Sequence, residues 1–144
     1  MTVAFVLGNG VSRSGLPLNQ IQKLGKIYGC NALYREFTPD VLVATDRAIS
    51  IRIQETGYPI KNKFYTRKPI EGLGAYRVPK EYYGFSSGPN AVAIAAIDQN
   101  HKIYIIGFDM GPSVHNQFNN IYEGTEFYKP QGSAPTYTGN WVKQ

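Results

Sequence analysis

The sequence predicts an α/β domain in which a mostly parallel sheet is covered by helices on both faces. Four short apolar runs rich in β-branched residues recur along the chain, as buried parallel strands require. Segments with helical character lie between them, and this alternation is typical of α/β folds. The chain has 144 residues, of which 42% are hydrophobic, enough for one well-packed core. We therefore expect a single three-layer domain over residues 1–144.

The predicted strands cover residues 3–7, 26–30, 41–44 and 102–106. Each is short and apolar, with the continuous hydrophobicity of a strand buried on both faces. The predicted helices cover residues 18–24, 47–55 and 90–99. The last is rich in Ala and Val, which suits close packing on a sheet.

Two segments depart from this alternation. Residues 57–85 contain three prolines and only short strand-like pieces, and such a connection is typical of either a functional lid or an edge hairpin. Residues 112–144 are rich in Gly, Asn, Pro and Tyr and show no helical period. We expect them to form an irregular, tyrosine-rich tail packed on the domain.

The chain carries a net charge of +5 and has a pI of about 9.3, which favours anionic partners. The basic residues are scattered, however, and only Arg67 and Lys68 are adjacent. A nucleic-acid surface needs a basic stripe or cluster, so the charge pattern favours a small anionic ligand over a nucleic acid.

The single Cys30 cannot form an internal disulfide, and no apolar stretch is long enough to cross a membrane. No charged leader precedes the first predicted strand. These features predict a cytoplasmic protein without membrane contact. Because a small sheet leaves unpaired edges, we also expect a homo-oligomer.

A glycine turn, Gly8, Asn9 and Gly10, directly follows the first predicted strand. Two glycines let the backbone turn sharply and approach a bound group, and a following helix would direct its amides at an anion. Ser12 and Arg13 add a hydroxyl and a guanidinium that suit a phosphate or a sugar. The loop is therefore a candidate ligand-binding element.

Two common nucleotide motifs do not fit this loop. A dinucleotide fingerprint needs glycine where Arg13 stands, and an acidic residue about twenty positions later, where the second strand ends at Asn31. A P-loop needs Lys and then Ser or Thr where Leu16 and Pro17 stand. The loop predicts neither NAD nor a Walker-type triphosphate site.

Small or polar residues also follow the other predicted strands. The carboxyl ends of parallel strands share one edge, and ligands bind there where the strand order reverses. A Ser-Ser-Gly sequence before the last predicted helix offers hydroxyls and amides to a phosphate. The candidate ligand-binding residues are Gly8, Asn9, Gly10, Ser12, Arg13, Asn31, Asp46, Ser86, Ser87, Gly88 and Asp109.

Each candidate also has a structural alternative. The glycines suit a simple strand-to-helix turn, Asp46 and Ser87 suit helix caps, Asn31 suits the bracing of a loop, and Asp109 suits a turn. If they bind a ligand, the two carboxylates would either accept ribose hydroxyls or hold a magnesium-bound phosphate.

Catalytic side chains are few. His115 follows the fourth predicted strand and is the candidate general base. Cys30 ends a strand, a position that favours burial over nucleophilic chemistry. No spacing of His, Cys or carboxylate residues indicates zinc.

The order of these motifs resembles a group of Rossmann-like proteins over residues 3–110. The group includes bacterial lipooligosaccharide sialyltransferases, motility accessory factors and archaeal-type hydroxymethylpterin diphosphokinases, and the chain also resembles small tailed-phage proteins. The matching motifs are Gly8-Asn9-Gly10 with Ser12, Cys30-Asn31, Ser86-Ser87-Gly88 and Ile106-Gly107-Phe108-Asp109. In the sialyltransferases such loops bind the cytidine monophosphate part of the donor. The resemblance thus implies nucleotide contacts at Asn9, Ser12, Asn31, Ser87 and Gly88.

The resemblance leads to two functional hypotheses. The first is a phage-encoded protein that binds and sequesters a nucleotide or nucleotide-derived metabolite in the host cytoplasm. The alternative is a small glycosyltransferase-like or diphosphotransferase enzyme that uses a nucleotide donor, with His115 as its base. Val11 stands where the sialyltransferases usually have proline, and His115 and Tyr122 are loose counterparts of their catalytic His and Tyr, which favours binding. A third class, an interaction protein whose exposed tyrosines meet a partner, stays open.

Overall fold

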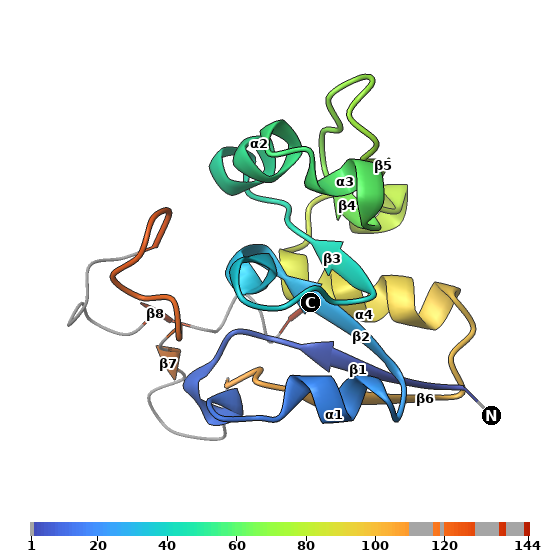
Figure 1. The fold of residues 1–144 in the computed structure, drawn as a ribbon, viewed down its shortest axis with the longest axis vertical. Helices are drawn as coiled ribbons and strands as arrows, with labels where there is room; N and C mark the ends of the chain where they lie inside the picture. Colours follow the sequence, from blue (N-terminus) through green and yellow to red (C-terminus); the bar gives the residue numbers. More distant parts are fainter. Residues whose placement is uncertain (1, 110–116, 119, 129–135, 138–142) are drawn as a thin grey trace.

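The computed structural model describes residues 2–109, 117–118, 120–128, 136–137 and 143–144. An open six-stranded sheet lies at its centre, and every neighbouring pair is parallel, in the order β5-β4-β3-β2-β1-β6 (Figure 1). This confirms the predicted α/β class with its parallel sheet. The strands are β1 (Val3–Leu7), β2 (Lys26–Cys30), β3 (Val41–Val43), β4 (Phe64–Thr66), β5 (Tyr76–Arg77) and β6 (Lys102–Ile106).

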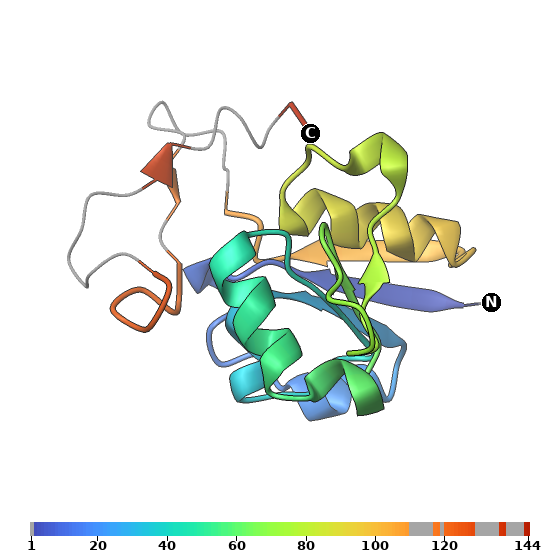
Figure 2. The ribbon, with the colours of Figure 1, turned by 90° about the horizontal axis from the view of Figure 1, so that it is seen from above.

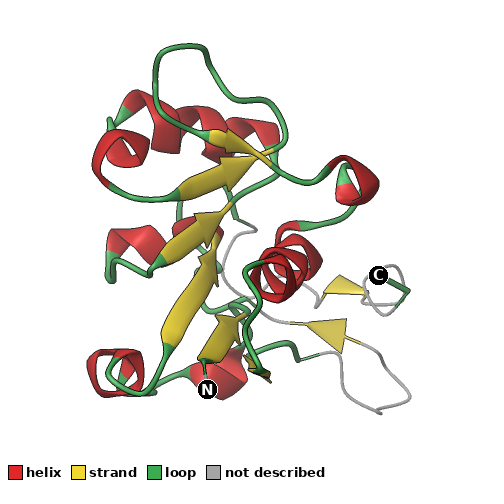
Figure 3. Cartoon of the chain, turned by 90° about the vertical axis from the view of Figure 1, so that its right-hand side faces the viewer, coloured by secondary structure: helices red, strands yellow, loops and turns green. Residues whose placement is uncertain are grey.

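Helices cover both faces of this sheet, which gives three layers (Figures 2 and 3). One face carries α4 (Ser87–Ile97), which contacts β1, β2, β3 and β6. The helices on the opposite face are α1 (Leu18–Gln22), η2 (Asn31–Arg35), α2 (Arg47–Glu55) and α3 (Tyr58–Lys61). The remaining short elements are η1 (Val11–Arg13), η3 (Lys80–Tyr82), and the antiparallel pair β7 (Gln117–Phe118) and β8 (Thr136–Tyr137). None of the helices in the described part of the chain has the length and apolarity that crossing a bilayer requires.

The two-residue period of the strands builds two cores. On β1, Ala4 and Val6 face α4, whereas Phe5 and Leu7 face the opposite helices. The same alternation continues on β3, where Val41 and Val43 join the first core and Leu42 joins the second. The cores are thus separated by the sheet, as the continuous hydrophobicity of the predicted strands requires.

Helix α4 begins three residues earlier than the sequence predicts. It starts at Ser87, and Pro89 lies inside its first turn. A proline is tolerated there because amides of the first turn have no partner within the helix. Ser87 and Gly88 are therefore part of the helix, with their backbone at its amide end.

Residues 57–85 do not form the edge hairpin that was one of the two expectations. β4 and β5 pair in parallel, with Tyr65 opposite Tyr76, whereas the strands of a hairpin are antiparallel. Among the residues that the structure describes, none from 57–85 lines the pocket presented in the next section. This segment widens the sheet rather than covering the pocket.

The strand order reverses at β1. The chain builds β2, β3, β4 and β5 outward on one side and then crosses through α4 to place β6 on the other side of β1. The switch point of the sheet therefore lies between the carboxyl ends of β1 and β6, where ligands of open α/β sheets bind.

Residues 120–128 pack beside this switch point and are called the arm below. The Ile121 amide donates to the Asn9 carbonyl at 2.8 Å, and Asn120 forms a β-bridge with Gly10. Tyr122 is 8% exposed and belongs to the core shared by the helices opposite α4. The arm thereby brings a distant part of the sequence to the carboxyl ends of the strands.

Candidate functional site

A pocket of about 250 Å³ lies at the carboxyl ends of the central strands. It is built from the loops that follow β1, β2, β3 and β6, the start of α4, and the arm. Its lining residues are Gly8, Asn9, Cys30, Asn31, Thr45, Asp46, Ser86, Ser87, Gly88, Pro89, Gly107, Phe108 and Asn120.

The first loop is held by a buried guanidinium. Arg13 is 4% exposed; its Nε donates to the Gly8 carbonyl at 2.7 Å and its Nη2 donates to Asn9 Oδ1 at 2.8 Å and to the Tyr122 hydroxyl at 3.1 Å. Asn9 Nδ2 in turn donates to the Cys30 carbonyl at 3.0 Å. Arg13 does not line the pocket. The geometry therefore gives this side chain a structural role in holding the first loop, and its expected ligand contact stays a prediction.

Tyr122 continues this network into the arm. Its hydroxyl donates to Glu36 Oε1 at 2.6 Å while accepting from Arg13. Burial first, and then the hydrogen bond to Glu36, raise the pKa of Tyr122 well above its usual value. Because this hydroxyl points into the network and does not line the pocket, Tyr122 ties the arm to the first loop.

Ser12 and Asp109 also bond to each other. Asp109 Oδ2 accepts from the Ser12 amide at 2.9 Å, and the Ser12 hydroxyl donates to Asp109 Oδ1. A Cβ on Gly10 would lie 2.4 Å from the Asp109 carboxyl carbon, so glycine is needed there for the β6 end to close on the loop. None of these three residues lines the pocket; their contacts join the first loop to the end of β6, and a ligand contact from them stays a prediction.

Three side chains join the loops after β2 and β3 to the start of α4. The Ser87 hydroxyl donates to Asn31 Oδ1 at 3.1 Å, accepts from the Thr45 amide at 2.9 Å, and lies 3.1 Å from Thr45 Oγ1. Asn31 has a φ of 52°, the left-handed region that Asn tolerates better than most residues. Ser87 is therefore a connecting residue and not the cap of α4, a position that Ser86 occupies.

The start of α4 offers amides to the pocket. Ser86 makes no capping bond with its side chain, and its amide donates to Gln144 Oε1 at 2.8 Å. The Ser87 and Gly88 amides belong to the first turn, which has no acceptor within the helix, and the partial positive charge of the helix dipole lies there. This end of α4 can hold an anionic or carbonyl oxygen.

Asp46 supplies the charged group of the pocket. It is exposed and occupies the cap position of α2, where its carbonyl accepts from the Ser50 amide, but its carboxylate makes no capping bond. Among the described residues, no hydrogen bond or ion pair engages this carboxylate. It can accept two or more hydrogen bonds from a ligand.

The candidate nucleophile and the candidate base are placed differently. Cys30 is buried, and this burial raises the pKa of its thiol to about 12 despite nearby Arg13, so the thiol is protonated at neutral pH. His115 lies outside the described residues, and its role as a base stays a prediction.

Seven of the predicted ligand-binding residues meet in the pocket: Gly8, Asn9, Asn31, Asp46, Ser86, Ser87 and Gly88. Gly10, Ser12, Arg13 and Asp109 are not among its lining residues. Gly107 and Phe108, next to Asp109 in the chain, line the pocket although they were not predicted to. Their position directly after a predicted strand could have identified them. Asn120 had no sequence signal, because the arm reaches the pocket only through tertiary packing.

The two carboxylates considered for a magnesium-bound phosphate are placed differently: Asp46 lines the pocket, whereas Asp109 is bonded to Ser12 and does not line it. No three His, Cys, Asp or Glu side chains gather into a metal-binding group anywhere in the described residues. A wider hollow of about 590 Å³ lies between the loop that leads into α1 and the residues after η2, and the charged groups on its wall, Arg13 and Glu36, are already joined through Tyr122.

Comparisons with protein families, with curated proteins and with solved structures gave no match to this chain. Its functional assignment therefore depends on the pocket itself.

Proposed function

We propose that this chain binds a nucleotide, or a metabolite derived from one, in the pocket at the carboxyl ends of its strands. The observation that carries the proposal is the meeting of the α4 amide end and the unengaged Asp46 carboxylate in one pocket of about 250 Å³. Helix amides suit a phosphate, and a carboxylate suits the hydroxyls of a sugar. A nucleotide presents both groups within one small molecule.

The charge of the lining limits how the phosphate is held. Asp46 is the charged side chain among the described lining residues, so amides and hydroxyls would hold the phosphate in place of a Lys or Arg. The net charge of +5 favours the approach of an anion to the whole protein.

We further propose that the ligand is sequestered and released unchanged. In support, the Cys30 thiol is kept protonated by burial, and the other described lining groups besides Asp46 are amides, hydroxyls, glycines and apolar side chains. This set can bind and orient a nucleotide through hydrogen bonds.

Calorimetric titration with AMP, GMP, CMP and UMP tests the proposal. At least one should bind, and Asp46→Asn should weaken it by about tenfold or more, because a charge-assisted hydrogen bond is lost. Glu71→Gln is the matched control, since Glu71 is exposed and lies outside the pocket; it should bind as the unmodified protein does. Failure of all four nucleotides to bind would refute the proposed function.

Native mass spectrometry of the purified protein then separates binding from chemistry. A co-purified nucleotide that is recovered unchanged after denaturation supports sequestration. Recovery of an altered nucleotide, with conversion lost in His115→Ala, would instead support the transferase alternative.

A further inference from the structure

A second cavity opens beside the pocket, between the arm and the first turn of α2. It has a volume of about 180 Å³ and is lined by Asn31, Asp46, Ala48, Ile49, Phe127 and Tyr128. Asn31 and Asp46 line both cavities, so the two are neighbours across these side chains. The first cavity is rich in amides and hydroxyls, whereas the second has aromatic and aliphatic walls.

Phe127 is held in this wall in an uncommon conformation. Its φ is 73°, which is costly for a bulky residue, and its side chain is 41% exposed although it is aromatic. Such backbone strain persists only where the surroundings impose it, and it clusters at ligand-binding sites. The position of this ring therefore calls for a functional explanation.

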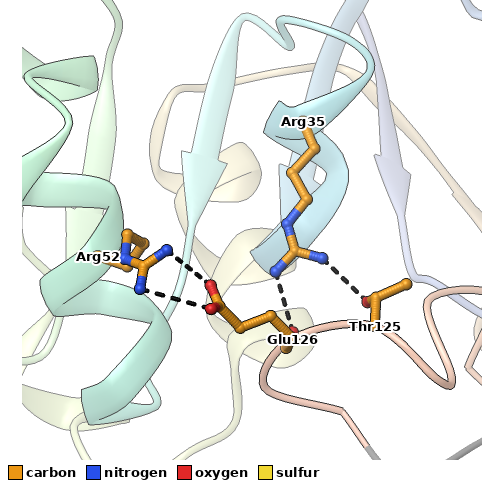
Figure 4. Close-up of polar contacts among 4 residues, drawn as sticks. All are labelled: Arg35, Arg52, Thr125 and Glu126. Carbon is orange, nitrogen blue, oxygen red and sulfur yellow. Dashed lines mark hydrogen bonds and ion pairs between the residues drawn. The ribbon is translucent and has the colours of Figure 1, made fainter.

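The two residues before Phe127, Thr125 and Glu126, are held by Arg35 and Arg52 (Figure 4). Arg52 forms an ion pair with Glu126 at 2.7 Å, and its guanidinium lies 5.5 Å from the Phe127 ring centroid. Arg35 donates to Thr125 Oγ1 and to the Glu126 carbonyl, both at 2.9 Å. The arm is thus fastened both to η2 and to α2.

Tyr128 closes the other end of the same turn. Its hydroxyl accepts from the Ala32 amide at 3.2 Å, and its ring lies 6.0 Å from the Arg35 guanidinium. Phe127 is therefore presented by a fixed loop, with anchored residues immediately before and after it. A preorganised ring loses little conformational freedom when a flat ligand stacks on it.

We propose that this second cavity is a base subsite, in which Phe127 stacks on the nucleobase. The proposal rests on the proposed function. The base would lie between Phe127 and the Ile49 side of α2, the sugar hydroxyls would meet Asp46 and Asn31, and the phosphate would lie at the start of α4. Stacking on an aromatic ring tolerates any base, so this subsite provides affinity for the base more than selectivity among bases.

The test compares a nucleotide with its base-free analogue. Dissociation constants are measured for the tightest-binding of AMP, GMP, CMP and UMP and for ribose 5-phosphate, in the unmodified protein and in Phe127→Ala. The variant should bind the nucleotide on the order of tenfold more weakly and bind ribose 5-phosphate unchanged. Phe127→Tyr keeps the ring and should bind both as before.

Two further variants test whether the loss of affinity is specific to the Phe127 ring. Tyr76→Ala removes another exposed ring, 55% exposed against 41% for Phe127, at the far edge of the sheet and should change neither constant. Phe127→Leu keeps apolar bulk, and it replaces Phe127→Ala if thermal unfolding shows that the alanine variant is not folded. An equal loss for both ligands, or no loss for either, would overturn the base subsite while leaving the proposed function in place. If no nucleotide binds the unmodified protein, both proposals fail.

Discussion

Two groups of residues around the pocket, called its two halves below, use their polar groups in opposite ways. In one half, residues 8–13 and 107–109, Arg13 is committed to a buried network and Asp109 is bonded to Ser12. In the other half, the Asp46 carboxylate and the first amides of α4 have no partner among the described residues. The comparison teaches that a polar residue after a strand predicts a ligand contact only if the fold leaves it unpaired.

The largest expected effect tests the paired half. Arg13→Ala should lower the free energy of unfolding by about 3 kcal/mol, because it empties a buried site and leaves the Gly8 carbonyl and Asn9 Oδ1 without a donor. Urea denaturation measures the change. Arg47→Ala removes an exposed guanidinium near the other half and should alter stability by less than about 0.5 kcal/mol. If both substitutions lowered the free energy of unfolding equally, the proposed difference between the two halves would be wrong.

The next effect concerns the close approach of β1 and β6. A Cβ on Gly8 would lie 2.6 Å from the Gly107 carbonyl oxygen, a backbone atom that cannot turn away. Gly8→Ala should therefore cost about 2 kcal/mol of unfolding free energy, as overpacking does. Gly84→Ala is the control, since nothing lies within 4 Å of its added Cβ and its φ is ordinary. Thermal unfolding should show that the control is no less stable than the unmodified protein.

A smaller effect tests the loop after β2. Asn31 has a positive φ, so Asn31→Ala should be less stable than Asn31→Gly by about 1 kcal/mol. Both substitutions lose the hydrogen bond from Ser87, so their difference isolates the backbone conformation. Chemical denaturation of the pair measures it, and identical stabilities would show that the left-handed conformation is not retained.

The smallest expected change in stability comes from comparing the two carboxylates, Asp109 and Asp46. Asp109→Asn should cost about 1 kcal/mol, because the Ser12 amide and hydroxyl lose a charged acceptor. Asp46→Asn should change stability by less than about 0.5 kcal/mol while weakening nucleotide binding. Calorimetry on both variants separates stability from binding. A larger loss of stability for Asp46→Asn would mean that this carboxylate has a structural role.

Much of the fold followed from local patterns. Continuous apolar runs identified β1, β2, β3 and β6, and the segments between them identified α1, α2 and α4. β1, β2 and β3 are largely buried, as such runs predict, whereas β6 is an edge strand whose side chains are mostly exposed. The short strand-like pieces within residues 57–85 became β4 and β5, which have only three and two residues. β4 is mostly buried and β5 is exposed, and their parallel pairing depends on the edge that β3 offers.

The pocket was only partly predictable. The ends of parallel strands must share an edge, so the convergence of Asn9, Asn31 and Asp46 could be expected from strand order alone. The sequence could not predict which polar groups stay unpaired, because Arg13 bonds to Tyr122, a residue more than a hundred positions away. The local sequence also gave no indication of where the arm packs or that Phe127 lies beside Asp46.

The α/β class, the parallel strands and the edge at which their polar residues gather could be read from the chain, since they depend on hydrophobic periodicity and chain direction. Which of those residues form internal hydrogen bonds and which face the pocket became clear only in the folded molecule. A buried polar group must find a partner, and the partners here come from segments far apart in the chain.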